Sequence, residues 1–484
     1  MTTPSDPHSL RVAPLRALER RLLLEHVEQS ERMRAVDVER VRYAMALARL
    51  DQLRVEGRDV DLFDAVSPFR HWLIEQLELF VDARGRRPID WGGLANLTPT
   101  IVKRADESRR HLLERHVQDF DEERLESEVR HRRLVLVLGG GGGSGYSHLG
   151  TFSVLSELGI VPSMIVGSSM GAMLGLFRAS MRHFDPLAIT VALPRPSEYT
   201  KVFSPYRGHS RFGFPGTFEL NIQAIARDVF RNMLSREVPL LSELPIPLRP
   251  VVTGLRTGVG VALSEVESEI DRARAEITPF AFRRRGLLLL STVRTMAENP
   301  RFLSRIVCGS DPEVRDFDAV DAAGFSCAVP GILHYDVFER DSPSARALKQ
   351  VMENRQLFRL TDGGIVGNVP SSAAWRCVQA GEITSRNAFI LSFDAFAPLV
   401  NANAAFIPVQ KVIHGQVLEE RAYSDYHHTY RTPPPPTRLL LGIDEVERTV
   451  ARVRRELQPV RAYLAASLRP LPRWAHLREA HLLR

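Results

Sequence analysis

The residue with the clearest chemical potential is a serine in a short motif flanked by glycines. Ser169 stands in the segment Gly167-Ser-Ser-Met-Gly171, which fits the pattern Gly-x-Ser-x-Gly. Apolar residues precede and follow the motif, as expected for a strand, a sharp turn and a helix. Glycines on both sides leave room for that turn, which exposes the serine at the N-terminus of the helix. Ser169 is therefore a candidate nucleophile, although a tight turn whose serine only caps a helix also fits the pattern.

A glycine-rich loop precedes this motif by one predicted helix and strand. Residues 139–150 read Gly-Gly-Gly-Gly-Gly-Ser-Gly-Tyr-Ser-His-Leu-Gly and follow the apolar run Leu134–Leu138. The backbone N–H groups of such a loop can approach an anion, and the N-terminus of the following helix adds a positive dipole. Gly140, Gly141 and Gly142 are the candidate donors to a developing oxyanion. Since no lysine follows the glycines, a P-loop is excluded; a flexible linker is the other interpretation.

The same loop also fits the fingerprint of a dinucleotide-binding site. Gly140, Gly142 and Gly145 match Gly-x-Gly-x-x-Gly. That fingerprint requires an acidic residue at the end of the second strand, where it holds a ribose hydroxyl. The second strand is predicted at Met164–Val166, and it leads into the serine motif and not into an acid. A dinucleotide-binding oxidoreductase remains the alternative function for this loop.

A serine hydroxyl needs a base to become a nucleophile near neutral pH. Asp362 follows the apolar residues Leu357 and Leu360 and precedes Gly363 and Gly364, so it is predicted at the turn after a strand. Its carboxylate can project into a cleft from that position, whereas an ordinary hairpin turn is the other interpretation of so short a motif. A histidine later in the chain would instead give the order Ser-Asp-His of α/β-hydrolases. The candidates for such a triad are His414, His427 and His428.

In these motifs the chain resembles the patatin-like phospholipase family. The matching features, in chain order, are the glycine loop with His148 and Gly150, the serine motif 167–172, and the turn 362–364 with Asn368 and Pro370. Segments 247–258 and 326–331 add weaker similarity to a strand pair and to a small-residue segment of that family. The resemblance spans about residues 132–396 and implies a three-layer α/β/α sheet domain.

The resemblance implies a lipid acyl hydrolase with a serine and aspartate dyad. In that mechanism Ser169 attacks the ester carbonyl and forms an acyl-enzyme, and Asp362 acts as the base. The amides of the glycine loop stabilise the oxyanion. The supporting motif residues are Gly167, Gly171, Gly363 and Gly364. The implied substrates are the carboxylic esters of phospholipids or lysophospholipids.

One departure from the family pattern affects the expected substrate. The family often has an arginine at the position of Ser144, and losing that guanidinium puts recognition of a phosphate headgroup in doubt. Neutral lipid esters therefore stay open as substrates. A noncatalytic regulatory protein is a separate alternative, against which the presence of both Ser169 and Asp362 argues. We expect no cofactor and no metal, because no cluster of histidines or carboxylates has ligand spacing. The expected partner is a lipid substrate, which the protein would reach by transient contact with a membrane surface. We do not expect binding to nucleic acid, and the sequence leaves the oligomeric state open.

The rest of the chain must position these motifs, and it divides into three predicted segments. Residues 1–130 are predicted as a helical accessory domain, since apolar side chains recur there at helical spacing with no strand signal. In residues 131–400 apolar strand-like runs alternate with helical patterns, which indicates an α/β sheet domain. Residues 401–484 are predicted as a linker and helical extension, in which Pro433–Pro436 favour an extended strap.

Three further segments have open interpretations. The last of the three predicted segments contains a basic helix whose apolar stripe consists of Val446, Val450, Val453 and Leu457. Such a helix is typical of binding at a membrane interface, but its stripe also fits packing on the protein's own core. The aromatic and basic segment 203–215 is either a mobile rim of an acyl pocket or a well-packed loop, and Arg283–Arg285 is either a phosphate contact or a solvated cluster.

Composition limits the remaining classes. The chain has 484 residues, of which 44% are hydrophobic and 25% charged, so we expect a globular protein with several domains. Subtracting 58 Asp plus Glu from 64 Lys plus Arg gives +6, a smaller surplus than nucleic-acid binding implies. The three cysteines form no Cys-x-x-Cys pair, which argues against a disulfide framework and fits a reducing cytoplasmic compartment. With no signal-peptide pattern and no run of ~18 apolar residues, any membrane contact is expected to be peripheral.

Overall fold

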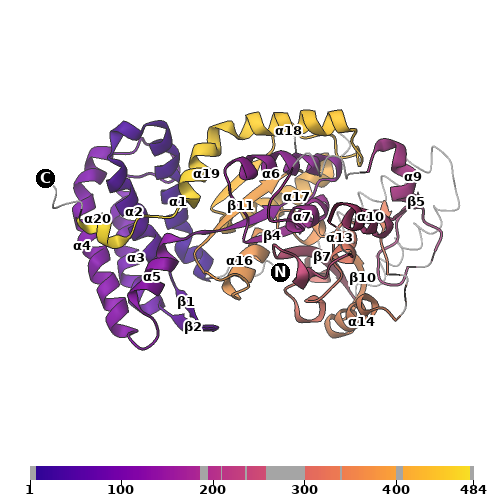
Figure 1. Ribbon diagram of the computed structural model, residues 1–484, viewed down its shortest axis with the longest axis horizontal. Coiled ribbons are helices and arrows are strands. Elements are labelled where there is room, and N and C mark those ends of the chain that lie inside the picture. The colour runs from indigo at the N-terminus through magenta and orange to yellow at the C-terminus, as the bar shows by residue number, and fades with distance from the viewer. Residues whose placement is uncertain are drawn as a thin grey trace.

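The structure, a computed structural model, describes residues 7–185, 194–208, 210–234, 237–257, 300–337, 339, 341–398 and 407–479. Helices dominate the first part of the chain, and Figure 1 shows them gathered at one end of the molecule. They are α1 (Pro7–Glu28), α2 (Ala35–Ala48), α3 (Phe63–Glu78), α4 (Trp91–Arg115) and α5 (Glu122–Arg130). Their apolar faces pack together, as the helical spacing of Leu73 and Leu77 predicts, and both of these side chains are fully buried.

The prediction that no strand interrupts these helices is wrong. Strand β1 (Gln52–Val55) pairs antiparallel with β2 (Arg58–Asp61) between α2 and α3. The two turn residues, Glu56 and Gly57, have positive φ angles of 49° and 87°. Such a pair of angles belongs to the tight hairpin turn whose twist matches that of the flanking strands.

One mixed sheet forms the centre of the molecule. Its members are β3 (Arg133–Leu138), β4 (Met164–Ser168), β7 (Leu248–Arg256), β8 (Leu303–Val307), β10 (Leu357–Thr361), β11 (Ala388–Asp394) and β12 (Tyr426–Thr429). The order is β10-β7-β4-β3-β11-β12, and β8 also pairs with β7. Strands β7, β4, β3, β11 and β12 run parallel to one another, whereas β8 and β10 run antiparallel to β7. The chain segment after residue 400, expected as a linker and helical extension, thus supplies a strand of this sheet.

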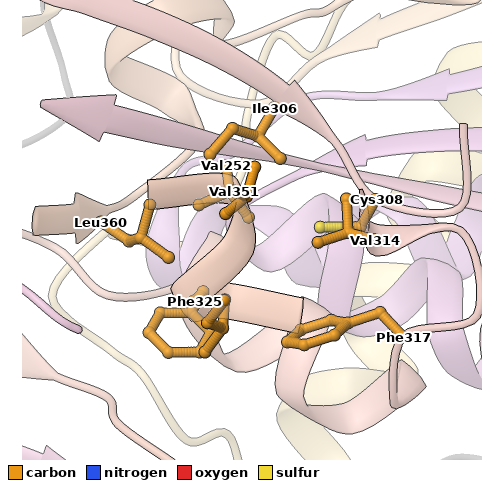
Figure 2. A pocket seen from close by; sticks show the side chains of 9 residues that line it. Val252, Ile306, Cys308, Val314, Phe317, Phe325, Val351 and Leu360 are labelled. Atoms are coloured by element: carbon orange, nitrogen blue, oxygen red, sulfur yellow. The ribbon is translucent and has the colours of Figure 1, made fainter. Parts of the chain in front are cut away.

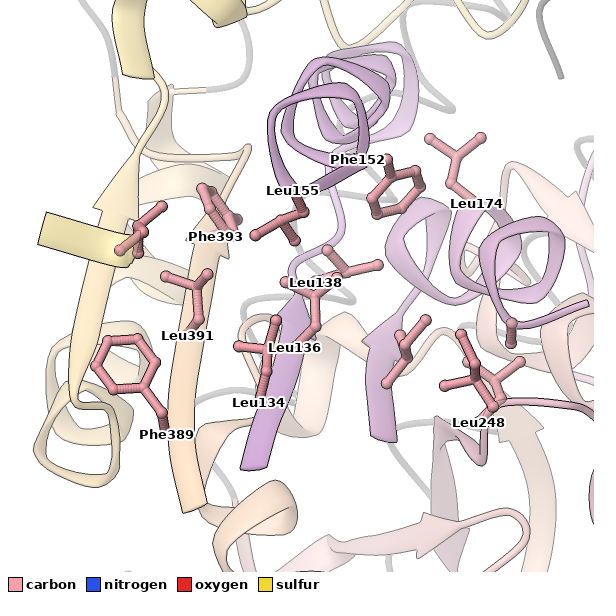
Figure 3. Close-up of a cluster of buried hydrophobic side chains, with 14 of the residues drawn as sticks. Leu134, Leu136, Leu138, Phe152, Leu155, Leu174, Leu248, Phe389, Leu391 and Phe393 are labelled. Carbon is pink, nitrogen blue, oxygen red and sulfur yellow. The ribbon is translucent and has the colours of Figure 1, made fainter. Parts of the chain in front are cut away.

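Helices cover both faces of the sheet, because side chains alternate between the two faces along each strand. Leu134, Leu136 and Leu138 of β3 pack in a core with α6 (Ser147–Glu157) and α7 (Met170–Ala179), as Figure 3 shows. Val135 and Val137 point to the other face and pack with residues of α16 (Ser371–Gln379) and α17 (Ile407–Glu420). The predicted three-layer α/β/α architecture is confirmed.

The C-terminal part of the chain returns along the sheet to the N-terminal helices. Helix α18 (Ile443–Leu457) lies along α6, and α19 (Arg461–Leu468) contacts α1. Finally α20 (Trp474–Glu479) packs on α2. The buried stripe residues Val446, Val453 and Leu457 belong to the main core, so the stripe of α18 packs on the protein itself and does not face a membrane. Among the described residues, no helix is both long and apolar enough to span a membrane.

Smaller elements lie in the chain between α7 and α16. They are α9 (Tyr199–Val202), β5 (Phe203–Pro205), β6 (Phe218–Leu220), α10 (Ile222–Leu234), α13 (Ala319–Ser326), β9 (Leu333–His334), α14 (Pro343–Arg355) and α15 (Gly364–Gly367). Strands β5, β6 and β9 form a small separate sheet. In segment 203–215 the aromatic side chains of Phe203, Tyr206, Phe212 and Phe214 are buried, which corresponds to the packed-loop interpretation. Arg283–Arg285 lie outside the described residues.

Candidate active site

Ser169 occupies a strained turn between β4 and α7. Its φ and ψ angles are 52° and −128°, a region that residues with a side chain rarely adopt. Neighbouring contacts enforce the turn: a Cβ atom at Gly171 would lie 2.3 Å from the carbonyl oxygen of Leu138. The amide of Ser169 donates to Ser326 Oγ at 2.9 Å, and this hydroxyl donates to the carbonyl of Val251 at 2.7 Å. The serine motif therefore forms the predicted strand, turn and helix.

Asp362 follows β10 in a turn that its neighbours fix. The Asp362 amide donates to the carbonyl of Ala328 at 2.9 Å, and the Thr253 hydroxyl donates to the Asp362 carbonyl at 2.7 Å. The carboxylate oxygen Oδ1 accepts the N–H of Gly364 at 2.7 Å. A Cβ atom at Gly363 would lie 1.9 Å from the carbonyl oxygen of Val251, so the chain passes too close there for any side chain. Because α15 follows directly, the turn is not the hairpin of the alternative interpretation.

The carboxylate of Asp362 is buried beside Ser169. Only 6% of Asp362 and 7% of Ser169 is exposed. Burial raises the pKa of Asp362 to about 6, while the nearby Ser169 hydroxyl and the Gly364 N–H lower it by smaller amounts. The oxygen Oδ2 has no well-aligned hydrogen-bond partner among the described residues. The structure therefore brings the predicted nucleophile and the predicted base within interaction range and leaves one carboxylate oxygen able to accept a proton.

The glycine loop contributes backbone amides next to Ser169. The N–H of Gly140 donates to the carbonyl of Asn368 at 3.2 Å, and that of Gly143 donates to the carbonyl of Pro436 at 3.0 Å. No hydrogen bond within the described residues uses the N–H of Gly141 or Gly142. These two residues have φ angles of 151° and 53°, which glycine adopts without strain. Of the three predicted donors, Gly140 is thus already engaged, and Gly141 and Gly142 are available.

An apolar cavity opens beside Ser169. It has an empty volume of about 820 Å³, its open mouth included. Its lining includes Gly142 and Ser169 at one end. The rest of the lining is almost entirely apolar: Tyr146, Met170, Met173, Leu174, Phe177, Pro194, Val202, Phe203, Leu220, Ile222, Ile225, Ala226, Cys327, Val329, Leu333, Leu439 and Leu440. A cavity of this size and character suits an acyl chain.

A second, smaller internal space is lined by apolar side chains and one cysteine and carries no comparable chemistry. Figure 2 shows it between β7, β8, β10 and α13, with Cys308 among apolar side chains. Burial raises the pKa of the Cys308 thiol, which keeps it protonated and unreactive. The three cysteines are free and buried, and the described residues contain no cluster of three or more groups suited to hold a metal ion.

The histidines proposed for a triad lie on other elements, two on a strand and one on a helix. His427 and His428 belong to β12, which is three strands from β4 in the order β4-β3-β11-β12, or roughly 14 Å at about 4.8 Å per strand. His428 pairs with Glu456 at 2.8 Å, and burial lowers the pKa of His427 to about 3. His414 lies on α17 near Asp394, a carboxyl whose pKa burial raises and whose neighbours, His414 among them, oppose that rise only in part. None of the three forms a hydrogen bond to Asp362 among the described residues.

The surroundings of the glycine loop do not suit a dinucleotide. Strand β4 ends at Ser168, and no acidic residue stands at its end. A Cβ atom at Gly142 would lie 2.5 Å from the carbonyl oxygen of Pro436, and one at Gly143 would lie 2.2 Å from that of Arg438. Carbonyl oxygens of the chain therefore face the loop where a pyrophosphate would have to bind, and they repel its charge.

Sequence reasoning named Asn368 only as a motif residue, noted Ser326 only within a weakly similar segment, and gave neither of them a supporting role. Ser326 links the elbow to β7 through Val251, and the carbonyl of Ser326 also accepts the N–H of Gly363. Asn368 reaches the glycine loop through its carbonyl. The weakly similar segments 247–258 and 326–331 were the signal that could have identified Val251 and Ser326 as supports of the elbow.

Comparison with known families fits this geometry. Residues 136–375 match the model of the family Patatin, described as patatin-like phospholipase. The matched segment includes the glycine loop, the serine elbow and the Asp362 turn. No curated protein matches the chain. The segment contains most of the central sheet together with the glycine loop, Ser169 and Asp362, and the match identifies residues 136–375 as a patatin-like phospholipase domain.

Proposed function

We propose that the protein hydrolyses carboxylic esters of lipids, phospholipids or lysophospholipids first among them, through Ser169 and Asp362. The match to this family supports lipid acyl hydrolase activity in general. The observation that carries the finer proposal is the buried carboxylate of Asp362, whose pKa is about 6, beside the hydroxyl of Ser169 at the end of an apolar cavity. A base with a pKa just below neutral is largely ionised at pH 7 and still accepts a proton efficiently.

In the proposed reaction the acyl chain lies in the cavity and the ester carbonyl lies at Ser169. Asp362 takes the hydroxyl proton as Ser169 Oγ attacks, and the tetrahedral oxyanion forms beside the free amides of Gly141 and Gly142. The first amide of α7, at Met170, has no intrahelical partner and points from the same helix N-terminus. Asp362 then returns the proton to the leaving alcohol, and water releases the acyl group from Ser169 by the same steps.

Three features separate this proposal from its rivals. The histidines of β12 are too far from Ser169 to complete a triad, which favours the dyad. Cys327 lines the cavity, but burial and the charge of Asp362 raise the pKa of its thiol, so it is a poor competing nucleophile. A noncatalytic module would not need an ionisable carboxylate buried at a cost in stability.

Labelling with a fluorophosphonate probe tests the proposal, since the probe reacts only with an activated serine. We expect the unmodified protein to label and Ser169→Ala not to label. Asp362→Asn should slow the reaction by ~10²–10⁴-fold, the range for loss of a general base. Ser168→Ala is the matched control, because Ser168 is the adjacent, fully buried serine and its hydroxyl has no partner among the described residues. Labelling that survives in Ser169→Ala, or is lost in Ser168→Ala alone, would contradict the assignment.

A panel of lipid esters then distinguishes the substrates. Phospholipid, lysophospholipid and triacylglycerol are compared in the same micelles, and release of fatty acid is measured. Faster hydrolysis of the phosphate-containing esters supports the proposed order, whereas faster hydrolysis of triacylglycerol would show that Ser144 marks an enzyme for neutral lipids.

A further inference from the structure

The segment between β12 and α18 contacts the glycine loop although it lies outside the family segment. We define residues 431–441 as the strap. Two carbonyl groups of the strap accept hydrogen bonds from neighbouring residues of the loop: the Gly143 amide donates to Pro436 at 3.0 Å, and the Ser144 hydroxyl donates to Pro434 at 2.7 Å. Because proline has no backbone N–H, consecutive prolines cannot satisfy one another's carbonyls. The strap therefore offers acceptors to a loop that lies 290 positions earlier in the chain.

The side chain of Ser144 is directed at the strap. Only 1% of Ser144 is exposed, and Ser144 is not among the described residues that line the acyl cavity. A serine hydroxyl has one proton to donate, and the carbonyl of Pro434 receives it. Ser144 is the departure from the family pattern, so in this chain the position serves to anchor the loop.

The backbone of Ser144 connects this anchor to one of the proposed oxyanion donors. The Ser144 amide donates to the carbonyl of Gly141 at 3.1 Å. That carbonyl and the N–H of Gly142 belong to one planar peptide group, and in a trans peptide they point in opposite directions. The bond to the Gly141 carbonyl therefore fixes the direction of the free Gly142 amide. Gly142 lines the cavity together with Ser169.

The loop is also fixed on the other side of the two free amides. The amides of Gly139 and Gly140 donate to carbonyls of β11 and of Asn368, at 2.9 Å and 3.2 Å. Burial lowers the pKa of His148 to about 4, so its ring is neutral at pH 7, and Nε2 donates to the carbonyl of Gly139 at 2.8 Å. The two free amides thus lie between two anchors, and the second anchor depends on the hydroxyl of Ser144.

We propose that Ser144 is a positioning residue of the oxyanion site, whose bond to the strap holds the Gly142 amide in the orientation that donates to the oxyanion. The inference rests on the proposed function, since it concerns the same site. Ser144 acts through the backbone and does not touch the substrate. Its loss should therefore slow the chemical step and leave substrate binding unchanged.

The kinetic test compares Ser144→Ala with the matched control Ser147→Ala in the full chain. Ser147 is also fully buried, but its hydroxyl has no hydrogen-bond partner among the described residues. With p-nitrophenyl octanoate as the substrate, we expect the kcat of Ser144→Ala to fall ~10-fold while KM stays within about twofold. This loss is smaller than the ~10²–10³-fold that removal of a whole oxyanion donor costs, because the amide itself remains. Ser147→Ala should keep both constants, and Ser144→Cys, whose thiol donates only weakly, should lie between them.

Amide hydrogen exchange keeps the test independent of catalysis. Peptides that cover residues 139–147 should exchange about tenfold faster in Ser144→Ala than in the unmodified protein, because the bonded amides of Gly143 and Ser144 open more often. Exchange in Ser147→Ala should be unchanged. If exchange responds in this way but the unmodified protein hydrolyses no ester, the anchor is supported and only the proposed function fails.

Three results would overturn the proposal. The first is exchange of the loop that is the same in Ser144→Ala as in the unmodified protein. The second is a rise in the KM of Ser144→Ala with no fall in kcat, or a fall in kcat that Ser147→Ala shares. The third is a changed ratio of phospholipid to triacylglycerol hydrolysis in Ser144→Ala, which would show that the hydroxyl contacts the substrate and does not act through the loop.

Discussion

Replacing Asp362 with asparagine should stabilise the protein while it abolishes turnover. The pKa of Asp362 rises from 3.8 to about 6 on folding, chiefly because the charged form is buried. A shift of about two units corresponds to about 3 kcal/mol at 1.36 kcal/mol per unit. Since the folded pKa lies above the unfolded one, the folded state is favoured when the group is protonated. The protein loses that contribution as the pH rises through 6, and at neutral pH the ionised carboxylate therefore costs stability.

Asparagine keeps the oxygen that accepts the Gly364 amide but carries no charge. We expect the free energy of unfolding of Asp362→Asn to exceed that of the unmodified protein by about 1–3 kcal/mol at about pH 8. At about pH 4 the difference should fall below about 1 kcal/mol, because Asp362 is then protonated in the folded protein. Urea unfolding at both pH values measures the difference, and Asp316→Asn is the control, since Asp316 is exposed.

Two results would refute the reasoning. If Asp362→Asn is less stable than the unmodified protein at both pH values, the carboxylate contributes more through its hydrogen bonds than its burial costs. If the variant gains equally at low and high pH, its effect does not come from the charge. A gain of the same size in Asp316→Asn would point to the net charge of the protein and not to the site.

Three further predictions concern other parts of the molecule. The kcat/KM of the unmodified protein should fall about tenfold per pH unit below about 6, where Asp362 becomes protonated; a profile flat down to about pH 4.5 would exclude Asp362 as the base. Gly143→Ala should lower turnover by displacing Pro435 and Arg438, whose carbonyl oxygens lie where the new Cβ atom would be. Gly415→Ala, where a Cβ atom meets nothing within 4 Å, should leave turnover unchanged; equal kinetics of the two variants would count against the contact between the glycine loop and residues 435–438. Glu19→Gln should lower the free energy of unfolding by about 3 kcal/mol at pH 7: burial opposes ionisation of Glu19, but Arg132 and two other arginines hold its pKa at about 2. The stabilisation by the ionised Glu19 carboxylate is present above pH 4.5 and is lost as the pH falls toward 2. If the free energy of unfolding of Glu19→Gln is still lower than that of the unmodified protein at about pH 2, the ion pairs with the arginines are not its cause.

The parts of the fold that could be predicted from sequence depend on local patterns. The run Leu134–Leu138 is apolar at every position, which indicates a strand buried on both faces, and the glycines beside Ser169 predict the sharp turn. The turn at Asp362 was ambiguous in isolation, since the same letters fit a hairpin. Only the order of the three motifs and the helical patterns between them made the α/β architecture predictable.

The parts that could not be predicted depend on contacts between distant segments. Strand β12 is four residues long and contains two histidines, so nothing in its sequence marks it as a strand; pairing with β11 makes it one. The hairpin β1–β2 turns at Glu56-Gly57, whose first residue is not one that usually favours a positive φ. Pro433–Pro436 indicate an extended segment, but their partner on the glycine loop is set by the tertiary fold.

These distant contacts also decide where the folding unit ends. The family segment stops at residue 375, before β11, yet β11 lies between β3 and β12 and pairs with both. Without β11 the oxyanion loop would lose the carbonyl of Phe393, which accepts the Gly139 amide at 2.9 Å. Without the segment between β12 and α18 the amide of Gly143 would lose its partner, the carbonyl of Pro436. The chemistry proposed for Ser169 therefore requires a unit that extends at least through Pro436, because the backbone amides beside the serine are oriented by segments that follow the family match.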